Sequence, residues 1–124
     1  MASTVKVRKA IKDQLATVVT AQYYQTAKEH TPAQYAVWTL TNVNADEILD
    51  QAELEIYLID RGDDTTAIET LADNVWELFD HWTYYSEADN VGFTTYPSVR
   101  NVLAVDDNTI KQRRLTFTVR VYGG

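Results

Sequence analysis

The fold is decided by residues 51–60, which read QAELEIYLID. Aliphatic and polar side chains alternate through this segment, with the aliphatic ones at Leu54, Ile56 and Leu58. Because successive side chains of a strand point to opposite faces, the alternation predicts a strand with one buried and one wet face. The wet face carries Glu53 and Glu55. A sheet that is covered on one side only follows from this pattern.

A helix is predicted on each side of this strand in the sequence. The first begins near residue 4, and its apolar residues recur at steps of three or four, at Val7, Ile11, Leu15 and Val18. The second begins at residue 65 or 66 and extends to Trp82, with an apolar stripe on one face throughout. Glu69 follows Thr66 by three residues, which is the spacing of a capping box.

Further strands are predicted from segments rich in β-branched and aromatic residues. They lie at residues 35–41, 91–96, 99–105 and 110–122. Pro97 ends the second of these, which is therefore a short edge strand. Residues 106–109 read Asp-Asp-Asn-Thr, which is turn chemistry that joins the last two strands in a hairpin. Residues 84–90 are predicted to be a polar aromatic connection.

The elements follow one another in the order α-β-β-α-β-β. This order predicts an α+β fold, with a mostly antiparallel sheet of about four to five strands and two main helices packed on one face. We expect a single domain over residues 1–124, since the chain shows no linker, repeat or low-complexity segment.

Composition argues against several classes of protein. The chain holds 18 Asp and Glu against 11 Lys and Arg, a formal charge of -7, which repels phosphate backbones and argues against general nucleic-acid binding. It contains no cysteine, so disulfides, thiolate metal sites and cysteine nucleophiles are excluded. No stretch approaches the roughly 18 to 20 apolar residues of a membrane span, so no membrane partner is expected.

Few residues could carry catalysis. His30 and His81 lie far apart in the sequence and belong to no nucleophile motif. The acidic pairs at 63–64 and 106–107 fall in turns, and the first lacks the spacing of a calcium loop. None of the four glycines has phosphate-loop spacing. We therefore expect no enzyme activity, no metal, no cofactor and no small-molecule substrate.

The candidate contact residues are aromatic and acidic. The pairs Tyr23-Tyr24 and Tyr84-Tyr85 come first, because two adjacent rings on regular structure cannot both point into one core. Tyrosine is also enriched at interface hot spots. In the alternative interpretation, one ring of each pair packs locally and the other is solvated. The acidic candidates for a subunit or partner surface are Glu53, Glu55, Asp46, Glu87 and Asp89.

The layout resembles that of the tail-terminator, or tail-completion, proteins of long-tailed bacteriophages and prophages. The resemblance covers nearly the whole chain. Its carriers are the opening helix with Val-Arg-Lys-Ala-Ile at 7–11, the strand at 53–60 with the helix at 65–82, and the closing strand at 113–122. The segment at 23–35 departs from the family pattern, because it is longer and more aromatic.

This resemblance implies a virion protein that assembles as a homohexameric ring on the head-proximal end of the tail tube. The ring stops tube growth and offers its other surface to the head-completion or connector protein, while DNA only passes through its lumen. Such a subunit is made in the host bacterial cytoplasm. Two alternatives stay open: a head-closure or minor capsid protein of the same virion, or a small cytosolic ligand-binding or regulatory domain.

Overall fold

The computed structural model describes residues 4–26, 33–42, 51–61, 65–88, 90–103 and 110–122. These residues form two helices and six strands. Helix α1 spans Thr4–Ala16, and helix α2 spans Thr66–Leu78. The strands are β1 (Gln22–Tyr24), β2 (Gln34–Asn42), β3 (Gln51–Arg61), β4 (Thr83–Ser86), β5 (Val91–Leu103) and β6 (Ile110–Tyr122).

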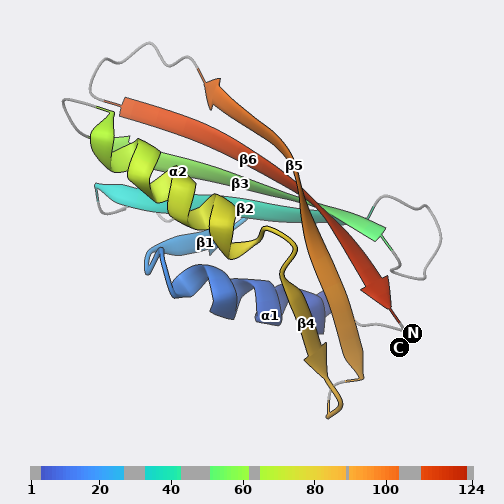
Figure 1. Cartoon of the computed structure of the whole chain (residues 1–124). Helices are drawn as coiled ribbons and strands as arrows, with labels where there is room; N and C mark the ends of the chain where they lie inside the picture. Colours follow the sequence, from blue (N-terminus) through green and yellow to red (C-terminus); the bar gives the residue numbers. More distant parts are fainter. Residues whose placement is uncertain are drawn as a thin grey trace.

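All six strands belong to one curled sheet, in the spatial order β1-β2-β3-β6-β5-β4 (Figure 1). Neighbouring strands run antiparallel, except that β1 pairs with β2 in parallel. The central strands β3 and β6 pair over the whole length of β3, from Gln51 opposite Arg120 to Arg61 opposite Ile110. The segment with the clearest alternation in the sequence therefore lies in the middle of the sheet.

The predicted fold class is wrong in its order and in its balance of elements. The order α-β-β-α-β-β omitted β1 and β4, and the sheet is a mixed one of six strands instead of one of four to five. The strands contain about twice as many residues as the helices, so the fold is mainly β. The omitted strands have only three and four residues, which is too short for an alternation to show.

The segments 91–96 and 99–105 belong to one strand where two were predicted. Strand β5 continues through Pro97, with an irregular register on β6 between Pro97 and Val99. Strand β4 pairs with β5 only as far as Thr94. Beyond that residue β5 is itself an edge strand, where a proline without an N–H is tolerated. The antiparallel pairing of the last two strands is confirmed.

Helix α2 ends four residues earlier than predicted, at Leu78 instead of Trp82. The chain turns there, and His81 adopts a positive φ of 53° just before β4 begins. Phe79 and Trp82 continue the apolar stripe without helical backbone, because their rings pack edge-on against each other at 5.6 Å and reach the core from the turn. The apolar stripe continues past the last helical residue, so the stripe alone predicted a helix that was too long.

Both helices cover the same face of the sheet, as predicted, and one core lies between them and the strands (Figure 1). The alternation in β3 is confirmed for Leu54, Ile56 and Leu58, which are fully buried. The largest fully buried side chains are four aromatic ones, Trp38, Phe79, Phe93 and Phe117. Burial of side chains this large contributes roughly 1.5–3 kcal/mol each. Among the described residues, no helix covers the opposite face, which we call the open face.

Candidate assembly surfaces

The first tyrosine pair lies on the edge strand β1, and its two rings diverge. Tyr24 packs edge-on against Trp38, with ring centroids 4.8 Å apart, and its hydroxyl donates to the Leu40 carbonyl oxygen at 3.3 Å. Tyr23 meets Tyr35 edge-on at 6.2 Å on the open face. Side-chain alternation along a strand produces this split.

Strand β1 is held by Trp38, a buried residue of β2. The indole Nε1 of Trp38 donates to Gln22 Oε1 at 2.8 Å, and the Trp38 carbonyl accepts from the Gln25 N–H at 2.8 Å. The Ala36 N–H donates to the Ala21 carbonyl at 3.0 Å. Gln25 then ends the strand with a positive φ of 70°. The aromatic segment that departed from the family pattern therefore contributes an extra edge strand.

The second tyrosine pair lies on the other edge strand, β4, and splits in the same way. Tyr84 turns toward the core, with ring centroids 5.3 Å from Phe93 and 5.9 Å from Trp82. Tyr85 points outward and is 72% exposed. Its ring lies over Gly92, where a Cβ atom would sit only 3.2 Å from the Tyr85 Cδ2. In both pairs one ring packs and the other points outward, so the interface role stays a prediction for Tyr23 and Tyr85.

The two glutamates of β3 lie on the open face, opposite Thr116 and Thr118 of β6. Glu53 is exposed, and Glu55 is half-buried and accepts a hydrogen bond from the Tyr57 hydroxyl at 3.0 Å. They line a shallow hollow of about 340 Å³ whose other walls are Gln51, Ala52, Ser98, Val99, Arg114, Thr116 and Thr118. This hollow is open, and most of the side chains that line it are polar or charged.

Two further tyrosines meet on the open face near β4. The Tyr96 and Tyr122 hydroxyls are 3.3 Å apart. This hydrogen bond raises the pKa of Tyr96 and lowers the pKa of Tyr122. The His81 ring stands edge-on to Tyr96 at 5.2 Å, and its Nδ1 lies 2.5 Å from Asp80 Oδ1. His81 is thus a surface residue bound to its sequence neighbour.

A wide cleft separates α1 from β1. It has a volume of about 800 Å³ and is lined by Val5, Arg8, Lys9, Lys12, Thr20, Ala21, Gln22, Tyr23, Tyr24, Thr26 and Trp38. The Arg8 guanidinium lies 3.9 Å from the centre of the Tyr24 ring, a cation–π contact. We call this surface the basic cleft, since its charged lining residues are all cations. The basic cleft was not predicted, because α1 and β1 come together only in the fold.

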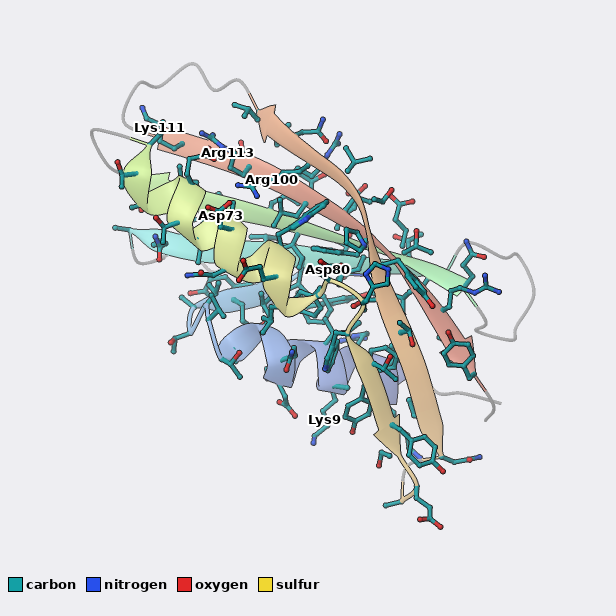
Figure 2. All side chains as sticks on the ribbon, in the orientation of Figure 1. Lys9, Asp73, Asp80, Arg100, Lys111 and Arg113 are labelled. Atoms are coloured by element: carbon teal, nitrogen blue, oxygen red, sulfur yellow. The ribbon has the colours of Figure 1, made fainter. Side chains whose placement is uncertain are left out.

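A network of charges binds α2 to the sheet, and the sequence did not predict it. Arg113 of β6 donates from Nε to Glu69 Oε1 at 2.5 Å, and Arg100 of β5 reaches Glu69 Oε2 at 3.4 Å and Asp73 Oδ1 at 2.8 Å. Figure 2 shows Arg100, Arg113 and Asp73 gathered beside α2. The capping-box prediction is wrong because it needs Thr66 at the N-cap. The N-cap is Thr65, which makes no side-chain cap hydrogen bond, and Glu69 binds arginine.

Several predicted residues lie outside the described residues. These are Asp46, Asp89, His30, the pair at 63–64 and the turn at 106–109. Glu87 is described and is exposed next to β4. Within the described ranges, no group of three or more His, Asp or Glu could hold a metal ion. No helix in the same ranges is long and apolar enough to cross a membrane.

Two solved structures are similar to this fold over nearly its whole length. A chain from the virion of a native gene transfer agent particle matches with a TM-score of 0.67 over 92% of both chains, at 17% sequence identity. The likeness is one of fold. A second solved protein, whose name describes no function, matches with a TM-score of 0.70 over 97% of this chain and 96% of its own, at 15% identity. No protein-family model and no curated protein matches the sequence.

Proposed function

We propose that this protein is a structural subunit of a phage-like virion, and that it closes into a homohexameric ring at the head-proximal end of the tail. The observation that carries the proposal is the fold, which a chain of a gene transfer agent virion shares over 92% of both chains. The tail-terminator resemblance of the sequence supports the same assignment. We propose no catalytic activity and no cofactor for this protein, because the proposed role consists of assembly alone.

In this role the ring binds the last layer of tail-tube subunits and ends tube growth. Its opposite surface binds the head-completion or connector protein, and DNA passes through the lumen. A ring requires a heterologous contact, in which one patch of a subunit meets a different patch of its neighbour. The two edges of the sheet offer two such different patches, since β1 lies beside a basic cleft and β4 carries an exposed tyrosine.

The test is the growth of tail tubes in the presence of this protein. Purified tube subunits from the same genome are allowed to polymerise, and tube length is measured by electron microscopy with and without the protein. We expect added protein to stop elongation and to sit as a ring at one tube end. Tubes of unchanged length, with bare ends at saturating protein, would refute the terminator role.

A further inference from the structure

We propose that the basic cleft receives the β4–β5 hairpin of a second copy of this chain, and that this contact repeats head to tail around the ring. The inference rests on the ring-forming function proposed above and names the two surfaces that meet. The basic cleft lies at the β1 edge of the sheet, and the hairpin forms the β4 edge.

Two of the three cations that line the basic cleft lack a carboxylate partner among the described residues. Among the described residues, neither Arg8 nor Lys12 takes part in an ion pair, and the Arg8 Nε is buried without a hydrogen-bond partner. Lys9 pairs only with Asp13, at 3.7 Å, and both side chains are more than half exposed. Figure 2 shows Lys9 pointing away from the sheet on α1. The cleft therefore holds positive charge that a partner can neutralise.

The hairpin lies in an acidic stretch of the chain. Residues 62–99 contain eight Asp and Glu and no Lys or Arg. Arg100 and Arg113 neutralise two of them beside α2. Three other acids have no Lys or Arg partner within the described ranges, and they lie from the end of α2 to the hairpin: Glu77, Asp80 and Glu87. The charge on this side of the molecule is thus opposite to that of the basic cleft.

The shapes also fit a contact between edges. The β4–β5 hairpin extends past α1 in Figure 1, and its most exposed large side chain is Tyr85. The basic cleft is wide enough for such a ring, and it presents Val5, which is 67% exposed, and the Arg8 guanidinium. A tyrosine can pack on both, by apolar contact and by a cation–π interaction. Glu87 then reaches the lysines at the rim.

A contact between opposite edges of one sheet also meets the symmetry requirement of a ring. The two surfaces are different, so each subunit uses its hairpin on one neighbour and its cleft on the other. Ionic attraction between them predicts assembly that weakens as salt rises, because exposed charges are screened within about 8 to 10 Å at physiological salt.

The test reverses charge on each surface separately and then mixes the variants. The cleft variant is Lys9→Glu with Lys12→Glu, and the hairpin variant is Tyr85→Ser with Glu87→Lys. All four side chains are half-buried or exposed, so each variant should keep the parent's melting temperature. Thr70→Lys, at an exposed and uncharged position of α2, is the control for the charge change.

We expect each variant alone to stay monomeric at concentrations where the parent forms rings, with association about tenfold weaker or more. In an equimolar mixture the intact hairpin of one variant can bind the intact cleft of the other, so the mixture should associate at least to a dimer where each variant alone stays monomeric. If both variants still formed rings of the same size as the unsubstituted protein, the proposed contact would be refuted but the proposed ring would not. Binding of inorganic phosphate or DNA to the parent, lost in the cleft variant while rings persist, would also overturn it.

A cross-link separates failure of the contact from failure of the ring. The chain has no cysteine, so Val5→Cys in one copy and Glu87→Cys in another form a unique pair. We expect an intermolecular disulfide on mild oxidation, and none when Thr70→Cys replaces Glu87→Cys. If the disulfide forms but the unsubstituted protein makes no rings, the contact is supported and the ring is refuted. Parent rings without the disulfide would refute the contact alone.

Discussion

Replacement of Glu69 by glutamine should destabilise the fold through Arg113. The Arg113 side chain is only 8% exposed, and Glu69 is the carboxylate that its Nε meets, at 2.5 Å. Removing one partner of a fully buried ion pair costs about 3–5 kcal/mol. Glu69 itself is 44% exposed, and a glutamine oxygen can still accept the hydrogen bond. We therefore expect a loss of about 2 kcal/mol in the free energy of unfolding.

Urea unfolding followed by tryptophan fluorescence measures this loss. The matched control is Glu77→Gln, an exposed position on the same helix, which should change the free energy of unfolding by less than about 0.5 kcal/mol. In a background of Arg113→Met, Glu69→Gln should cost less than about 1 kcal/mol, because the buried charge is gone and only the more exposed pair with Arg100 remains. Equal effects of Glu69→Gln and Glu77→Gln, or an undiminished cost with Met at position 113, would refute the reasoning.

Three further predictions concern the tyrosines and β1. Tyr84→Ser should cost roughly 2–3 kcal/mol of stability by urea unfolding, because Tyr84 packs on Phe93, whereas Tyr85→Ser should cost under about 0.5 kcal/mol but weaken assembly measured by light scattering. Trp38→Phe should remove the hydrogen bond to Gln22, cost about 1 kcal/mol and speed hydrogen exchange at the Gln25 and Ala36 amides; unchanged exchange would count against that anchor. In an alkaline titration followed by tyrosinate absorbance, the lowered pKa should make Tyr122 ionise before Tyr96, and Tyr96→Phe should return the Tyr122 pKa toward 10.0. A lowered pKa adds stability as pH rises and a raised pKa removes it, so the two shifts act on the free energy of unfolding in opposite directions through this range.

The long periodic segments were predictable because their patterns are local. Strands β3 and β6 are each more than ten residues long and alternate over residues 51–58 and 115–122, and α2 carries an apolar stripe, so their existence follows from side-chain geometry alone. The short strands β1 and β4 form because they pair with β2 and β5, and such pairing leaves no period in the sequence. The end of α2 was predicted too late because Phe79 and Trp82, which follow the helix in a turn, pack into the same core as the helix does.

The candidate surfaces were predictable to a smaller extent. Alternation along a strand correctly indicated that Tyr84 and Tyr85 cannot share one core. The pairing of Arg113 with Glu69 joins residues 44 positions apart, and the basic cleft joins α1 to a strand that was not expected. Both depend on which strands become neighbours, and the charges in the sequence do not specify that.

The mass of the purified protein in solution tests the central claim most directly. Light scattering behind size exclusion, over a wide range of concentration and salt, is combined with negative-stain imaging of the same fractions. We predict a species of hexamer mass with a central hole, which is lost as salt rises. A protein that remains monomeric at every concentration, with or without tail-tube subunits, would contradict the ring.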